Sequence, residues 1–200
     1  MAQKPDAEKL DLERYISDFF KFVQNKKVEL YNEFSLQHEL GIYLRNHLPR
    51  DYKVQFERNV SFFGIESKTV KKEIDIVIFT PKMDRKYAIE LKYPRNGQHP
   101  EQMYAFVKDI RFVEQLQENG FIQACAVTLV EDKLFYSGRN ENGIYQFFRG
   151  DKPKPVKGTI TKPTGKRNES VTVSEGHPIC WQDLDGVDGK QRKYYIVTIG

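Results

Sequence analysis

The chain has 200 residues, enough for one domain with a substantial core, and its 30% charged and 39% hydrophobic residues are typical of a soluble globular protein. The formal net charge of +4 is compatible with a nucleic-acid partner but is not specific for one. Two cysteines without zinc-ligand spacing argue against a structural zinc site, and the lack of an apolar leader or a long apolar run predicts a cytoplasmic protein with no membrane segment.

Two amphipathic helices are expected near the start of the chain. Residues 10–26 place their apolar side chains on one helical face, and a second helix is expected to begin with Ser35 as its N-cap. Glu39 borders the apolar stripe of this second helix, because it lies three residues after Leu36 and four before Tyr43. Its carboxylate is therefore expected at the edge of the core.

Three consecutive antiparallel strands are expected next. Residues 52–63 alternate well enough to form the first, and residues 71–93 form two apolar strands around a short turn, as in a β-hairpin. Charged residues interrupt this hairpin, with Asp75 in its first strand and Glu90 and Lys92 in its second. A turn centred between positions 82 and 83 sets Asp75 opposite Glu90, and a turn centred one position later sets it opposite Lys92. Both registers bring the three groups together, whereas a slip of one residue would separate them.

A third helix and a buried strand complete the expected core. Pro100 and Glu101 favour a helix start, and apolar residues with helical spacing continue to a stop signal at Asn119. Gln102, in the first turn of this helix, is expected to approach the charged strand. The run 121–130 is apolar on both faces, which is typical of a strand in a parallel or central position. The expected sheet is therefore mixed and flanked by helices.

The rest of the chain is expected to form a β-rich extension packed on the core. Short β-like runs at 134–138 and 144–148 precede a basic loop, residues 150–170, that is rich in Pro and Gly. Its basic side chains are either solvated or contact a polyanion: Lys152, Lys154, Lys157, Lys162, Lys166 and Arg167. Further strands are expected at 171–173, 179–181 and 194–199. This divides the chain into a core, residues 1–136, and an extension, residues 137–200.

The pattern of Asp75, followed on the next strand by Glu90-Leu91-Lys92, resembles the active-site motif of the PD-(D/E)XK nuclease superfamily. Ile74 stands where that motif often has proline. The expected α/β (α+β) order of elements, αβββαβ, also resembles the restriction-endonuclease-like core of that superfamily. A cross-strand salt bridge that closes a surface hairpin is the alternative interpretation of the same charges.

The resemblance implies a divalent-metal site. Asp75 and Glu90, with the carbonyl of Leu91, would bind Mg²⁺ or Mn²⁺, since these ions prefer oxygen ligands and keep several waters. Lys92 would activate the attacking water, and we expect the nearby cation to lower the pKa of Lys92.

Two other positions are candidates for the same site. In the superfamily the first core helix often supplies an acidic residue, for which Glu39 is the first candidate and Glu33 the second. Gln102 is a candidate at the rim. Glu39 and Gln102 could equally be ordinary helix residues that face solvent, since the sequence pattern would be the same.

The expected function is thus a metal-dependent nuclease that hydrolyses DNA, with a role in restriction, defence or repair. The alternative is a catalytically inactive protein of the same fold that binds nucleic acid or a protein partner. A homodimer is left open. No nucleotide-binding loop and no Ser/His/Asp nucleophile pattern competes with the hairpin cluster.

Overall fold

The computed structural model describes every residue except 1–8, 27, 96, 166–167 and 186–188. Its helices are α1 (Leu12–Lys26), α2 (Glu33–His47) and α3 (His99–Glu118), with the short 3₁₀ helices η1 (Val60–Phe63), η2 (Lys133–Phe135) and η3 (Gly143–Phe147). Its strands are β1 (Lys53–Asn59), β2 (Glu73–Phe79), β3 (Lys86–Lys92), β4 (Gln123–Val130), β5 (Val156–Thr161), β6 (Ser170–His177), β7 (Gln182–Asp185) and β8 (Gln191–Ile199).

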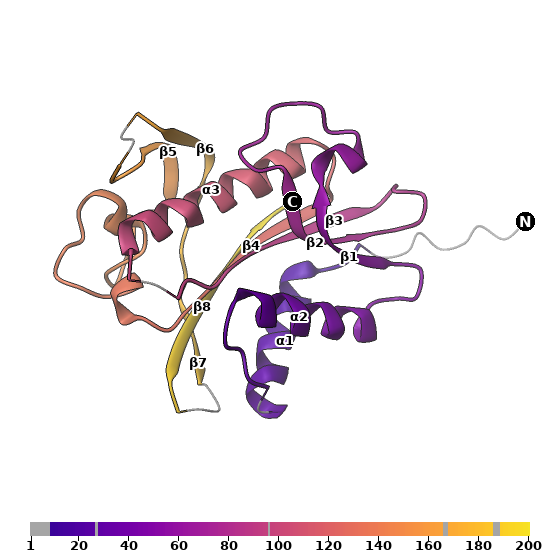
Figure 1. Cartoon of the computed structure of the whole chain (residues 1–200), viewed down its shortest axis with the longest axis horizontal. Coiled ribbons are helices and arrows are strands. Elements are labelled where there is room, and N and C mark those ends of the chain that lie inside the picture. Colours follow the sequence, from indigo (N-terminus) through magenta and orange to yellow (C-terminus); the bar gives the residue numbers. More distant parts are fainter. Residues whose placement is uncertain (1–8, 27, 96, 166–167, 186–188) are drawn as a thin grey trace, which may run out of the picture.

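A mixed six-stranded sheet forms the centre of this α/β fold, in the order β1-β2-β3-β4-β8-β7. Strands β1, β2 and β3 are antiparallel neighbours, whereas β3 and β4 run parallel, joined by α3. Figure 1 shows α1 and α2 on one face of the sheet and α3 on the other. The expected mixed sheet with helices on both faces is confirmed, and it has two apolar cores, one on each face.

The register of the β2–β3 hairpin determines which charged residues meet. Ile76 pairs with Ile89, and continuing this antiparallel register places Asp75 opposite Glu90. This is the register expected from a turn centred between positions 82 and 83.

Helix α2 begins earlier than the sequence pattern suggested. Asn32, and not Ser35, is the N-cap: the Asn32 side chain accepts a hydrogen bond from the Ser35 N–H at 2.8 Å, and the Ser35 hydroxyl accepts one from the Asn32 N–H at 3.0 Å. This reciprocal capping box fixes the entry of the chain into the helix. Glu33 and Phe34 consequently lie in a well-ordered first turn.

The C-terminal strands differ most from the expected extension. β8 pairs antiparallel with β4, and β7 pairs with β8, so both enlarge the central sheet. A boundary after residue 136 would therefore cut through one sheet. Among the described residues, the β5–β6 hairpin forms the second, separate sheet, and Figure 1 shows it beside α3.

Three short segments expected as strand adopt other structure. The runs 134–138 and 144–148 contain η2 and η3, and the last part of 52–63 is η1. Asparagine and aspartate caps explain two of these helical turns, because Asn59 accepts from the Ser61 N–H and Asp132 accepts from the Leu134 N–H. The run 179–181 precedes β7 and lies outside it.

Glu114, buried on α3, attaches the β5–β6 hairpin to the core. Its carboxylate accepts hydrogen bonds from the backbone N–H groups of Ser174 and Glu175 at 3.0 and 2.9 Å, and lies 2.9 Å from Nε2 of His177. Burial opposes the charged form, but these hydrogen bonds outweigh it and lower the pKa of Glu114 to about 2. Glu114 is therefore a charged anchor in a mostly apolar interface.

We expect Glu114→Gln to lower the free energy of unfolding by about 2 to 3 kcal/mol at neutral pH. A carboxyl pKa below its unfolded value of 4.5 stabilises the fold above that pH, and this contribution is lost as the pH falls toward 2. Denaturant unfolding at a series of pH values should show the difference between wild type and variant shrinking on acidification. Glu118→Gln, at a more exposed position on the same helix, is the control; a loss independent of pH would contradict the charged-anchor role.

Candidate active site

Asp75 and Glu90 meet where the β2–β3 ladder ends. The backbone N–H of Asp75 donates to Glu90 Oε1 at 3.2 Å, and the N–H of Leu91 donates to Asp75 Oδ2 at 2.7 Å. Beyond the Ile76–Ile89 pair, the backbone N–H groups of Asp75 and Leu91 thus donate to side-chain carboxylates, whereas in a continued ladder they would donate to backbone carbonyls. The structure brings these two predicted residues together.

A lysine and a third carboxylate lie behind this pair. The Lys71 ammonium contacts Glu90 Oε2 and lies 3.1 Å from Oδ1 of Asp109, which projects from α3. Glu90 is fully buried and Asp109 is 5% exposed. The second carboxylate oxygen of Asp109, Oδ2, is buried and has no hydrogen-bond partner among the described residues. Such an orphaned oxygen is costly to bury, so it is the atom of this cluster most in need of a ligand.

The electrostatics of the cluster show a shortage of positive charge. Burial raises the pKa of Asp75 to about 6, and burial together with neighbouring carboxylates raises the pKa values of Glu90 and Asp109 above their usual range. Burial alone would lower the pKa of Lys71, but Asp109 and Glu90 outweigh it and raise that pKa. Burial outweighs Lys71 and Lys92, which both lower the pKa values of Asp75 and Asp109, so binding of protons or of a further cation is favoured here.

Lys92 lies at the end of β3 and pairs with α2. Its Nζ is 3.2 Å from Glu33 Oε1, and the other Glu33 oxygen accepts from the Tyr93 N–H at 2.9 Å. Burial would lower the pKa of Lys92, but Asp109 and Glu33 outweigh it and raise that pKa in the absence of a cation. The lowering expected from a nearby cation stays a prediction. A raised pKa favours the protonated form, in which the Lys92 ammonium can donate to a water or a phosphoryl oxygen.

The acidic residue that α2 directs to the site is Glu33. Glu39 is half-buried almost two turns further along α2, on a different side of the helix. Gln102 is half-buried in α3, two turns before Asp109 and on the same side of that helix. The second candidate of the sequence interpretation, Glu33, thus replaces the first, whereas the placement of Gln102 at the rim stays a prediction.

A small notch opens beside Asp75. Its volume is about 50 Å³, and its lining comes from the start of α2 and from the strands: Glu33, Phe34, Gln37, Glu57, Asp75 and Leu91. Gln37 Nε2 donates to Glu57 Oε1 at 2.6 Å and to the Asp75 carbonyl at 2.9 Å. Glu57 has a φ of 49°, a left-handed conformation that non-glycine residues rarely adopt. Strain of this kind often marks functional positions.

Lys71 and Asp109 were not predicted from the sequence. A signal for Asp109 exists, because it lies three residues after Phe106 and four before Val113, inside the apolar face of α3. Lys71 carries no comparable signal, since its neighbour Lys72 has the same charge and is exposed.

Two described lysines of the basic stretch contact residues outside the carboxylate cluster. Lys162 lies near Glu101 and Glu169, at 3.6 and 3.8 Å, and Lys154 donates to the Gln146 side chain at 3.0 Å. Lys152 and Lys157 are exposed, the latter on β5, so part of the expected loop is a strand. Lys166 and Arg167 lie outside the described residues.

No family model, curated protein or solved structure matches this chain. The function must therefore be argued from the chemistry of the site itself. Within the described part of the chain, no group of three or more His, Cys, Asp or Glu side chains is arranged to hold a metal ion in its present positions. No described helix is long and apolar enough to cross a bilayer.

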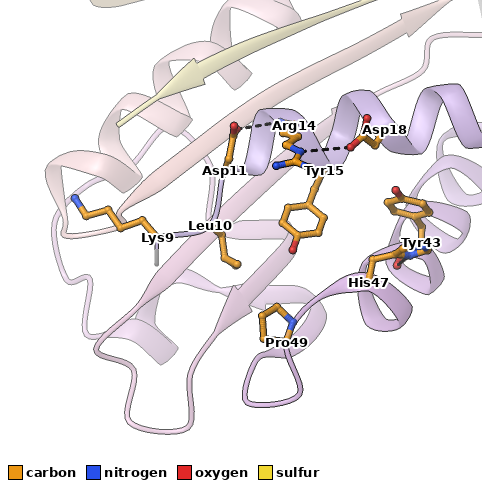
Figure 2. Close-up of a pocket in the computed structure, with 9 residues that line it drawn as sticks. All are labelled: Lys9, Leu10, Asp11, Arg14, Tyr15, Asp18, Tyr43, His47 and Pro49. Carbon is orange, nitrogen blue, oxygen red and sulfur yellow. Dashed lines mark hydrogen bonds and ion pairs between the residues drawn. The ribbon is translucent and has the colours of Figure 1, made fainter. Parts of the chain in front are cut away.

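A second concavity, of about 450 Å³, lies at the other end of α2. Figure 2 shows Tyr15, Tyr43 and His47 around it, with Arg14 and Asp18 paired on its edge. Its ion pair is exposed, and His47 Nδ1 lies 2.7 Å from the Tyr43 carbonyl. The helix separates this pocket from Glu33 by about 20 Å, at 1.5 Å per residue. It lacks the buried charges of the carboxylate cluster, so we place the candidate active site at the cluster.

Proposed function

We propose that this chain is a metal-dependent phosphodiesterase that cleaves nucleic acid, with DNA as the expected substrate. The observation that carries the proposal is the meeting of Asp75, Glu90 and Asp109 around too little positive charge, with Lys92 beside them. The order α2-β1-β2-β3-α3-β4 supports the resemblance to the PD-(D/E)XK superfamily, whose motif residues occupy the end of this hairpin.

The donor set suits Mg²⁺ or Mn²⁺. Carboxylate oxygens are the ligands these hard cations prefer. Asp109 Oδ2 has no hydrogen-bond partner among the described residues and is available as a metal ligand. Asp75, Glu90 and Asp109 would hold the ion, with the Leu91 carbonyl as a further candidate. In the present arrangement Lys71 lies between Glu90 and Asp109, so its ammonium must move for a cation to reach both.

A bound cation would supply an activated water and neutralise charge on the phosphoryl group. The protein's own contribution follows from its charges. Lys92, protonated at Nζ, donates to the attacking water or to a phosphoryl oxygen, and Glu33 holds its side chain in place. Lys71 lies against Glu90 and Asp109 at the base of the cluster and favours the ionised form of Glu90, against burial and the neighbouring carboxylates.

One observation favours the alternative, a protein of this fold without catalysis. Lys71 already pairs with Glu90 and Asp109, as a structural ion cluster would require. This alternative leaves the orphaned Asp109 oxygen and the raised pKa of Asp75 without a role.

Incubation of the purified chain with plasmid and single-stranded DNA distinguishes the two. Strand breaks should appear with Mg²⁺ or Mn²⁺, disappear with EDTA, and be absent in a Glu90→Gln preparation made in parallel. No cleavage by folded wild-type protein, or cleavage that survives both EDTA and Glu90→Gln, would reject the nuclease.

A further inference from the structure

Two large aromatic side chains are exposed near the start of α2. Phe34 is 77% exposed and Tyr31 is 59% exposed, although both adjoin the buried start of α2. Phe34 also lines the notch that contains Asp75. This exposed phenyl ring contributes little to the core and offers an apolar face to a ligand at the notch.

Hydrogen bonds of the capping box hold the backbone that carries these rings. The N–H groups of Tyr31 and Asn32 both donate to the Ser35 hydroxyl, at 2.9 and 3.0 Å, within the capping box that starts α2. Phe34 follows directly in the first turn. A ring presented on a fixed turn loses little conformational entropy when a ligand covers it, which favours binding.

The surroundings of Phe34 indicate what that ligand is. The lining of the notch combines this apolar ring with the carboxylates of Glu57 and Asp75, and the ammonium of Lys92 lies beside Glu33. A nucleobase has an apolar face for stacking and a polar edge with amino groups from which a carboxylate such as that of Glu57 can accept, and it is joined to a phosphate. A wholly apolar peptide segment would not use these polar groups.

We propose that Phe34 is a stacking platform for an unpaired nucleobase next to the phosphodiester held at the carboxylate cluster. Paired bases keep their faces inside the helical stack, so the preferred substrate is single-stranded nucleic acid or a duplex with an unpaired base. This inference rests on the proposed function, because it deepens the substrate class of the same site.

The test is binding of labelled single-stranded and duplex DNA of equal length, by fluorescence anisotropy in Ca²⁺ at fixed salt. Phe34→Ala should weaken single-strand binding by about 5- to 100-fold, the range for loss of one stacked base, and change duplex binding by less than about twofold. Phe34→Trp should retain single-strand affinity. Ile42→Ala, which removes another exposed apolar side chain from α2, is the control and should change neither.

Equal losses for single strand and duplex, no loss in Phe34→Ala, or an equal effect of Ile42→Ala would overturn the stacking role. Thermal unfolding of each variant excludes a folding defect as the cause. The two proposals fail separately. If the wild type binds single strands through Phe34 but does not cleave with Mg²⁺ or Mn²⁺, the nuclease is rejected and the platform is retained. If the protein cleaves, and Phe34→Ala changes neither cleavage nor binding, only the platform is rejected.

Discussion

Lys71→Met should lower the free energy of unfolding by about 3 to 5 kcal/mol near neutral pH, the usual loss when one partner of a buried ion pair is removed. The side chain of Lys71 is 26% exposed, but its partners Glu90 and Asp109 are buried and would be left without their shared ammonium. Because burial already raises the pKa values of both carboxyl groups, they can take up protons, and the loss should be smaller at acidic pH.

A divalent cation should restore much of this lost stability. With the ammonium gone, Mg²⁺ or Mn²⁺ can enter between Glu90 and Asp109, and a ligand at a hundred times its dissociation constant stabilises the folded state by about 2.7 kcal/mol. Denaturant unfolding with EDTA and with Mn²⁺ measures this. Lys72→Met, at the exposed neighbouring position, is the matched control. A Lys71→Met protein as stable as wild type, or one that Mn²⁺ stabilises no more than Lys72→Met, would contradict this picture of the cluster.

Lys92→Met should lower cleavage by roughly 10²-fold or more while leaving the fold nearly intact. Methionine keeps the length and apolar stem of lysine and removes the charge. The partner lost is Glu33, whose side chain is 41% exposed, so the pair contributes at most about 1 kcal/mol. Lys71, in contrast, pairs directly with the buried Glu90 and Asp109, whereas Asp109 acts on Lys92 as a nearby charge.

Cleavage rate and thermal unfolding should be measured on one preparation of Lys92→Met. Lys82→Met, at the far end of the same hairpin, controls for loss of a lysine from these strands. A stable Lys92→Met protein that cleaves like wild type would remove Lys92 from the catalytic site. A strongly unstable one would mean that Lys92 holds the fold, as in the alternative without catalysis.

The hairpin could be predicted from the sequence because its information is local. Strand composition, alternation and a short turn limited the register to two choices that keep Asp75 near Glu90. The turn decided between them: the Thr80 N–H donates to the Arg85 carbonyl at 3.1 Å, and Met83 takes a left-handed φ of 57°. The sequence of the turn did not predict this conformation, since methionine rarely adopts a positive φ.

The rest of the site depends on contacts between distant segments. Asp109 reaches Lys71 and Glu90 only after α3 packs across the sheet, and pairing of β8 with β4 joins residues far apart in sequence. The start of α2 also decides which acidic residue lies at the site. Because Asn32 caps the helix, Glu33 falls in its first turn, where its carboxylate contacts Lys92. Sequence patterns report local periodicity and so could not show these placements.

The most direct test is calorimetric titration of Mn²⁺ into the wild-type chain and into Asp75→Asn. A cation site at the carboxylate cluster predicts saturable binding to the wild type, competition by Mg²⁺, and an affinity at least about tenfold weaker in Asp75→Asn. Asparagine preserves the size of the side chain and removes the negative charge, so the variant should remain folded. A folded wild-type protein that takes up no Mn²⁺, or equal affinity in both proteins, would contradict the metal-dependent function.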